Sequence, residues 1–132
     1  MARKPIPLAD VLVGIESEDH FERRVTRMAQ LHRWCGYHIR YSVAATRGVH
    51  RFGRDGHACG MGFPDWVFVK PGHPPKYREL KTERGRLTRE QMYWQALLKA
   101  AGADVGVWRP SMTPSIMAEF GVETPLDDSS GV

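Results

Sequence analysis

The chain has 132 residues and a net charge of +4, with 42% hydrophobic and 26% charged residues. This composition fits one globular domain with a single modest core. No apolar run approaches the roughly 20 residues that cross a bilayer, so no membrane partner is expected. The start of the chain lacks an apolar export signal, and its two cysteines, Cys35 and Cys59, form no close pair. We therefore expect a reducing, cytoplasmic setting.

The positive charge is concentrated before residue 119. Four acids and no lysine or arginine follow residue 118, which leaves 19 basic against 11 acidic residues in 1–118. Such an excess of positive charge favours a polyanionic partner, although a high isoelectric point is also common in small proteins that bind no nucleic acid.

The first half of the chain predicts one long helix and one strand. Residues 1–16 are expected to be a lead-in, in which the apolar segment 8–15 packs on the body of the protein. Ser17 is a good N-cap, and apolar residues recur after it at helical spacing, which predicts a helix over 17–34. Aromatic and β-branched residues then predict a strand over 37–43.

The second half predicts two strands, a helix and a fourth strand. Residues 65–70 and 76–82 are rich in β-formers and flank a turn with proline and glycine, so they predict a hairpin. Thr88 and Gln91 form a capping-box pattern, which predicts a helix that ends at Gly102. The remaining predicted elements are a strand over 104–108, a short helix over 113–120 and a polar, acidic tail over 121–132.

This order of elements predicts an α/β fold. The hairpin strands pair antiparallel, whereas a strand that follows a helix can join the sheet by a crossover. The four strands should therefore form a mixed sheet flanked by helices.

One acid opens the second predicted strand, and an acid-x-Lys triplet lies in the third. Because residues i and i+2 of a strand point to the same face, Glu79 and Lys81 should project together, and Asp65 can reach them across the hairpin. Asp65, Glu79 and the Leu80 carbonyl could hold Mg²⁺, while Lys81 would position or help to deprotonate an attacking water. A lone Glu-x-Lys triplet is more often a solvated surface pair. The triplet together with an acid at the start of the paired strand is more specific, and this combination predicts the metal site for phosphodiester cleavage.

Four separated blocks of the sequence carry a family resemblance. They are Gly62-Phe63-Pro64-Asp65, Glu79-Leu80-Lys81, the segment Gly85 to Trp94 with Leu87, Thr88 and Gln91, and the segment Gly102 to Pro110. In this order and spacing they resemble the VRR-NUC group of the PD-(D/E)xK nuclease superfamily over about residues 17–110. The resemblance implies a restriction-endonuclease-like αβββαβ core, a nuclease domain over 17–120, and cleavage of DNA that depends on Mg²⁺ or Mn²⁺.

The resemblance also implies an acid on the first helix, and two residues compete for this role. On a helical wheel at about 100° per residue, Glu18 lies within an apolar stripe that includes Phe21 and Val25, whereas Glu22 lies nearer the polar edge. A charge directed at the sheet is costly without a partner such as a metal, which favours Glu18. Acids in the first turn of a helix are also common on exposed surfaces, so both residues stay candidates.

Gln91 and five arginines complete the candidate site. From the residues alone, Gln91 is the capping-box partner of Thr88 at the start of its helix. The family resemblance instead implies a place beside the active site, in contact with water or phosphate. We expect the arginines to contact phosphates without sequence preference, although solvated positions account for any one of them equally well. They are Arg47, Arg51 and Arg54 before Asp65, and Arg84 and Arg86 before the second long helix.

The leading interpretation is a divalent-metal-dependent DNA endonuclease, specific for structures such as junctions or flaps. The alternatives are a nucleic-acid-binding module that does not cleave and an RNA-processing nuclease, because DNA and RNA offer the same phosphate chemistry. A chain of 15.0 kDa presents little surface to a duplex, so a homodimer is also predicted. Small stand-alone members of the group occur in phage and bacteria, which implies the cytoplasm of a bacterial or phage-infected cell.

Overall fold

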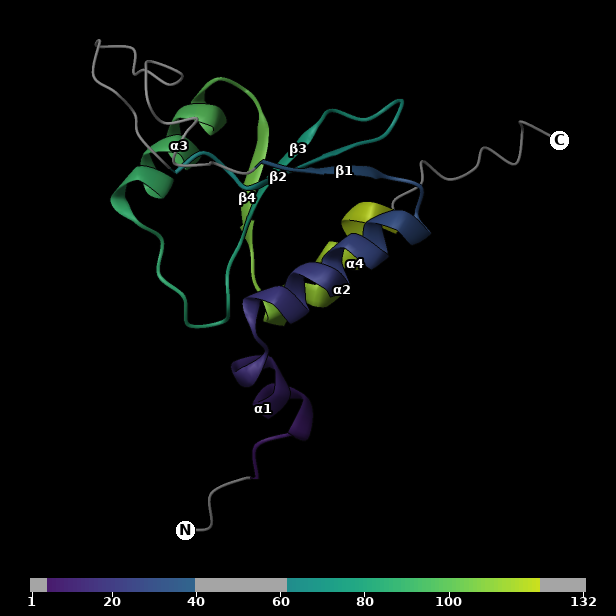
Figure 1. The fold of residues 1–132 in the computed structure, drawn as a ribbon, viewed down its shortest axis with the longest axis vertical. Coiled ribbons are helices and arrows are strands. Elements are labelled where there is room, and N and C mark those ends of the chain that lie inside the picture. Colours follow the sequence, from purple (N-terminus) through teal and green to yellow (C-terminus); the bar gives the residue numbers. More distant parts are fainter. Residues whose placement is uncertain (1–4, 40–61, 122–132) are drawn as a thin grey trace, which may run out of the picture.

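The structure is a computed structural model that describes residues 5–39 and 62–121 (Figure 1). Its elements in chain order are α1 (Leu8–Ile15), α2 (Glu18–Leu31), β1 (Cys35–His38), β2 (Trp66–Val69), β3 (Lys76–Leu80), α3 (Arg89–Ala100), β4 (Asp104–Trp108), the 3-10 helix η2 (Pro110–Met112) and α4 (Thr113–Gly121). The predicted end of the first strand and the predicted tail after residue 121 lie outside the described residues.

The strands form one sheet in the order β1-β2-β3-β4. β1, β2 and β3 pair antiparallel in turn, and β4 pairs parallel to β3 after the crossover through α3. Helices α2 and α4 lie on one side of the sheet and α3 lies on the other (Figure 1). The predicted α/β class, with a mixed four-stranded sheet flanked by helices, is confirmed.

Capping residues begin and end the two long helices. The Ser17 hydroxyl accepts a hydrogen bond from the backbone N–H of His20, and Thr88 and Gln91 form both bonds of the predicted capping box. Helix α3 ends at Ala100, and Gly102 follows its C-cap in the predicted C′ position, with a φ of 87° that glycine adopts readily. Helix α2 ends at Leu31, earlier than predicted, because the chain turns there and buries Trp34.

The main core lies between the sheet and the α2–α4 pair. The Trp34 indole N–H donates to the Phe120 carbonyl at 3.0 Å, which fixes the end of α2 against α4. Of the four tryptophans, three are buried in this core and Trp94, on α3, is half-buried. The core side chains are Phe21, Val25, Met28, Ala29, Trp34, Trp66, Phe68, Leu80, Trp108, Ile116 and Phe120.

The predicted apolar lead-in is a helix, but its packing on the body was predicted wrongly. Leu8 and Ile15 are each 72% exposed, and Val11 and Leu12 are also exposed. The reason is that α2 and α4 already cover the core, so that α1 meets mainly η2 and projects from the body (Figure 1). Within the described ranges, no helix combines the length and apolar character needed to span a membrane.

Candidate active site

Asp65 and Glu79 form a pair of carboxylates at the end of the β2–β3 hairpin. The ladder places Trp66 opposite Arg78, so the next residues outward, Asp65 and Glu79, also face each other. The backbone N–H of Asp65 donates to Glu79 Oε2 at 3.3 Å, and that of Leu80 donates to Asp65 Oδ1 at 3.2 Å. The structure therefore brings together the two acids that the sequence predicted, and we call them the carboxylate pair.

Alternation along β3 assigns the pair to one face of the sheet. The Arg78 guanidinium lies over the Trp108 ring, 4.8 Å from its centroid, and Leu80 lies in the main core. Tyr77 contacts Phe63 on the opposite side. Because side chains alternate along a strand, Glu79 shares the face of Tyr77, which is the face that α3 covers in part.

The three residues before Asp65 fix its position. A Cβ at Gly62 would lie 2.5 Å from the backbone carbonyl carbon of Glu90, and the φ of Gly62 is 126°, so a side chain is excluded on both grounds. The Phe63 ring packs edge-on against Trp94 at a centroid distance of 5.1 Å, and Pro64 is fully buried. These contacts place the start of β2 against α3 and leave the Asp65 carboxylate directed at Glu79.

The electrostatics of the pair are unfavourable for two free carboxylates. Burial, followed by repulsion from the Asp65 carboxylate, raises the pKa of Glu79 to about 8. Burial also raises the pKa of Asp65, and the bond from the Leu80 N–H opposes this shift. Glu79 is only 5% exposed, so water relieves the repulsion poorly. A cation between the two groups would relieve it.

The donor set fits a hard divalent cation such as Mg²⁺ or Mn²⁺. Leu80 directs its N–H at Asp65, and in a strand the carbonyl of a residue points to the same side as its N–H, so the Leu80 carbonyl also faces Asp65. Two carboxylates and one carbonyl suffice for Mg²⁺, which retains several waters or takes phosphate oxygens. In the described part of the chain, no three or more His, Cys, Asp or Glu side chains are grouped to hold a metal.

Lys81 and Gln91 approach Glu79 from two sides. Lys81 Nζ lies 3.9 Å from Glu79 Oε1. Gln91 Nε2 donates to the same oxygen at 2.8 Å, while Gln91 Oε1 accepts from the Thr88 backbone N–H at 2.9 Å. One side chain thus completes the predicted capping box and also contacts Glu79, and the expected contact of Gln91 with water or phosphate stays a prediction.

The two acids of α2 occupy different environments. Glu18 is exposed, so the prediction that it points toward the sheet was wrong. The first turn of α2 extends beyond the core, and helical side chains lean toward the N-terminus, which carries Glu18 away from the sheet. Glu22 is half-buried, and its Oε1 lies 3.7 Å from Nδ1 of His38. Of the two candidates, Glu22 is the one that the structure links to the sheet.

His38 is a neighbour of the site that the sequence interpretation missed. Its ring stacks on Trp66 with centroids 4.7 Å apart. Burial raises the pKa of Asp65, and the charge of His38 lies close enough to lower it. In the sequence His38 lies near the start of the strand predicted over 37–43, and only its observed pairing with Trp66 brings it to the start of β2.

The loop after Lys81 is fastened by Arg109. Arg109 Nη1 donates to the carbonyls of Thr82 at 2.7 Å and Gly85 at 2.6 Å, and more weakly to that of Glu83 at 3.3 Å. The sequence interpretation did not find this role of Arg109. Its hydrogen bonds hold the loop between β3 and α3, which carries Arg84. Arg109 belongs to the last of the four sequence blocks, but the sequence does not reveal these contacts, because its partners lie 24 to 27 residues away.

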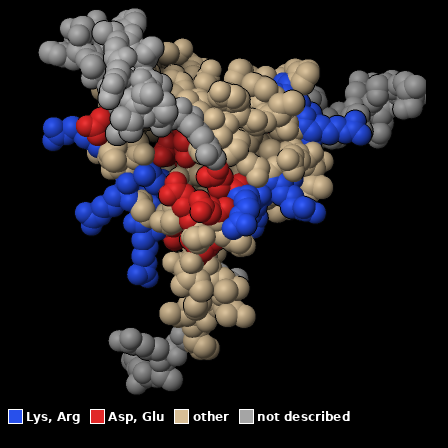
Figure 2. All heavy atoms as spheres, viewed as in Figure 1, with Lys and Arg blue, Asp and Glu red and all other residues tan. Residues whose placement is uncertain are grey.

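The predicted phosphate-binding arginines divide into two groups. Arg84 and Arg86 are exposed in the loop between β3 and α3. Figure 2 shows acidic side chains gathered in the centre of one face, with lysine and arginine side chains on both sides. The remaining three, Arg47, Arg51 and Arg54, lie outside the described residues.

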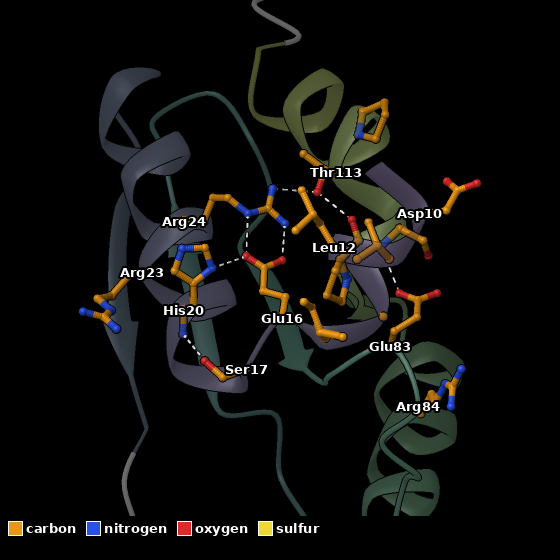
Figure 3. Close-up of a pocket in the computed structure, with 16 residues that line it drawn as sticks. Asp10, Leu12, Glu16, Ser17, His20, Arg23, Arg24, Glu83, Arg84 and Thr113 are labelled. Carbon is orange, nitrogen blue, oxygen red and sulfur yellow. Dashed lines mark hydrogen bonds and ion pairs between the residues drawn. The ribbon is translucent and has the colours of Figure 1, made fainter. Parts of the chain in front are cut away.

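A separate hollow lies where α1, α2 and η2 meet (Figure 3). Glu16 accepts from Nε and Nη2 of Arg24 at 2.9 and 2.7 Å, and Arg24 Nη1 donates to the Thr113 hydroxyl at 2.7 Å. The hydrogen bond from Arg24 is the main cause that lowers the pKa of Glu16. The charges of Glu16 and Arg24 thus compensate each other, and their hydrogen bonds link the α1–α2 junction to the start of α4.

Comparisons with known proteins found no relative. No protein-family model, no curated protein and no solved structure matches the chain.

Proposed function

We propose that the chain is a divalent-metal-dependent nuclease that hydrolyses phosphodiester bonds in DNA, with a restriction-endonuclease-like core of the VRR-NUC type. The observation that carries the proposal is the carboxylate pair, in which Asp65 and Glu79 meet with poor charge compensation beside Lys81. The helix–strand order and the four sequence blocks support the same conclusion.

Each residue of the site has a distinct part in this proposal. Asp65, Glu79 and the Leu80 carbonyl would hold the cation, which when bound would supply an activated water and neutralise charge on the phosphate. Gln91 keeps the Glu79 carboxylate in its orientation. Lys81 places a positive charge beside the reacting phosphate and is positioned to hold the attacking water. Glu22 replaces Glu18 as the preferred helix-borne acid, because it lies 3.7 Å from His38, whose charge acts on Asp65.

The arginines that flank the site would bind the phosphodiester backbone. Arg84 and Arg86 are exposed next to the N-terminus of α3, where helix N–H groups also favour phosphate. Such contacts give affinity but no sequence preference. We expect the Arg84→Ala/Arg86→Ala double variant to weaken DNA binding and to reduce its salt dependence, with a slope lower by about 1–2.

Cleavage assays with active-site variants test the proposal. The purified protein is incubated with Mg²⁺ or Mn²⁺ and labelled linear, flapped, gapped and four-way DNAs, and with an RNA of the same sequence. Asp65→Asn, Glu79→Gln and Lys81→Met should each lower the cleavage rate at least about a hundredfold. Asp10→Asn, on the exposed helix α1, is the matched control and should cleave at the wild-type rate.

The outcomes separate the alternatives. Cleavage that persists in all three active-site variants would place the activity elsewhere or in a contaminant. Binding without cleavage in any cation would favour the non-cleaving module, and cleavage of the RNA alone would favour the RNA-processing nuclease.

A homodimer is part of the proposal. The exposed apolar side chains of α1, which include Leu8 and Leu12, are the feature of the described residues that best supports self-association. Size-exclusion chromatography with light scattering should give about twice 15.0 kDa. A monomer at micromolar concentration, with and without DNA, would contradict this part of the proposal.

A further inference from the structure

Tyr37 is an exposed aromatic residue on the same face of the sheet as the carboxylate pair. The ladder pairs Tyr37 with Val67, and Val67 with Tyr77, which shares the face of Glu79. Two residues further along the chain, the Ile39 N–H donates to the Asp65 carbonyl at 2.7 Å. Ile39, Asp65 and Glu79 thus lie side by side across β1, β2 and β3. Because paired residues share a face, Tyr37 lies on the face of the carboxylate pair, two residues along β1 from this row.

The ring of Tyr37 is accessible to a ligand. Tyr37 is 70% exposed, whereas the aromatic rings on the opposite face, such as Trp66 and Phe68, are buried. Its neighbours toward the outer end of the sheet, Cys35 and Val69, are exposed as well. Single exposed apolar residues are common on protein surfaces. The position of Tyr37 beside a phosphate-cleaving site is what distinguishes it.

The spacing along the strand fits one or two nucleotides. Two residues of a strand extend about 6.5 Å, and stacked nucleotides rise about 3.4 Å each along one strand. A phosphate held at the carboxylate pair would therefore place a neighbouring base within reach of the Tyr37 ring. A base that is paired within a duplex has both of its faces covered by stacked neighbours, so only an unpaired base can lie on the ring.

We propose that Tyr37 is a stacking platform for an unpaired nucleotide next to the scissile phosphate. The preferred substrate is then a DNA in which one or two nucleotides beside the cleaved bond are single-stranded, as at a flap or a gap. This inference rests on the proposed function, because it takes the phosphate bound at Asp65 and Glu79 as its origin. Stacking on an aromatic ring tolerates any base, so the selectivity is for strand structure and not for sequence.

Fluorescence and kinetics with matched substrates test this inference. One DNA carries 2-aminopurine one nucleotide from the cleaved phosphate in a gap, and its partner carries the same base in a continuous duplex. Binding is measured in Ca²⁺ and cleavage in Mg²⁺ or Mn²⁺. The variants are Tyr37→Ala, Tyr37→Phe, which keeps the ring, and Leu31→Ala, an equally exposed residue at the end of α2.

The wild type, Tyr37→Phe and Leu31→Ala should quench the 2-aminopurine in the gap, and Tyr37→Ala should not. Tyr37→Ala should raise KM for the gapped DNA about tenfold, within the roughly 5- to 150-fold expected for one lost stacking contact. For the continuous duplex the change should stay below about twofold, and kcat should fall little because the carboxylate pair is intact.

Several results would overturn the inference. Quenching that persists in Tyr37→Ala, or an equal rise of KM for both DNAs, would show that the ring does not stack on the base. A change of oligomeric state in Tyr37→Ala would assign the ring to self-association instead. If the wild type binds DNA without cleaving it, the proposed nuclease function fails while the quenching comparison still decides the role of Tyr37. If it binds no DNA, both fail.

Discussion

The two faces of β3 bury charge in opposite ways. On the face toward α2 and α4, Arg78 Nη2 lies 2.6 Å from Asp104 Oδ1 and 2.9 Å from Glu119 Oε1, and Lys76 Nζ lies 2.9 Å from Asp104 Oδ2. On the face toward α3, Glu79 faces the carboxylate of Asp65, and its cationic neighbour Lys81 is more distant, with Nζ 3.9 Å from Glu79 Oε1.

Burial alone does not separate these two regions. Arg78 is 3% exposed and Glu79 is 5% exposed, although they are neighbours in sequence. Burial of Asp104 opposes its ionisation, but hydrogen bonds from Lys76 and Arg78 outweigh this and lower its pKa, whereas the pKa of Glu79 rises to about 8. A buried charge that the protein compensates is structural. A buried acid that it leaves poorly compensated indicates a partner from outside the protein, which in the function we propose is a cation.

The largest effect on stability is expected on the compensated face. Arg78→Ala leaves Asp104 and Glu119 without their main partner in a partly buried site. We expect a loss of about 3 kcal/mol of unfolding free energy, measured by urea denaturation. Glu79→Gln keeps the shape of the side chain and removes the repulsion, so it should change stability by less than about 0.5 kcal/mol or increase it.

Arg27→Ala is the matched control, because Arg27 is exposed on α2, and it should stay within about 0.5 kcal/mol of wild type. Equal losses for Arg78→Ala and Glu79→Gln would remove the contrast between the faces. The carboxylate pair would then be a structural element like the network around Arg78.

The next largest effect concerns the placement of the carboxylate pair. Gly62→Ala should cost about 2–3 kcal/mol, because the φ of 126° is strained for alanine and its Cβ would lie 2.5 Å from the Glu90 backbone. Gly72→Ala is the matched control, since Gly72 also has a positive φ, 85°, but nothing within 4 Å of an added Cβ. It should cost only about 1 kcal/mol for the backbone strain.

Cleavage measured on the same variants sharpens this comparison. Gly62→Ala should also slow cleavage, because the segment that places Asp65 against Glu79 must shift, whereas Gly72→Ala should leave the rate unchanged. Equal costs for the two substitutions would show that α3 does not fix the start of β2.

The sequence predicts local features of this fold well. Caps, the hairpin and the Asp65–Glu79 spacing depend on a few neighbouring residues, and the alternation of a strand is enough to place Glu79 and Lys81 on one face. Gln91 was found because the capping box and the family resemblance both point to it. These features need no knowledge of how distant parts of the chain pack.

Features that depend on distant contacts were missed. Arg78 reaches Glu119 across 41 residues, and Arg109 reaches back to the loop after β3, so neither contact leaves a local pattern. The helical wheel places Glu18 near the apolar stripe, but it does not reveal that this position in the first turn of α2 is exposed. The exposure of Leu8 was missed for the same reason, because apolar character does not reveal whether a partner surface is left to cover it.

A moderate effect is expected when a divalent cation is added. If the cation binds at the carboxylate pair, a concentration of ten times Kd stabilises the fold by about 1.4 kcal/mol, which for a chain of this size raises Tm by roughly 3–6 °C. Asp65→Asn and Glu79→Gln should abolish the shift, and Asp10→Asn should retain it. Thermal unfolding at constant ionic strength measures the effect, and a shift that survives in both active-site variants would place cation binding elsewhere.

The smallest effect is the pH dependence of the compensated face. Because its cationic partners lower the pKa of Asp104 below the usual 3.8, its stabilisation is fully present above that value and is lost as the pH falls through the lowered pKa. The Asp104 side chain is 33% exposed, so we expect a contribution below about 1 kcal/mol.

Urea denaturation of wild type and Asp104→Asn between pH 2.5 and 7, with Asp10→Asn as control, measures this contribution. The difference between wild type and Asp104→Asn should be constant above about pH 5 and should shrink below pH 4, because protonated Asp104 no longer attracts Arg78. A difference that does not change with pH would mean that Asp104 acts by its hydrogen bonds alone. The distinction between the faces of β3 would then rest on geometry and not on charge.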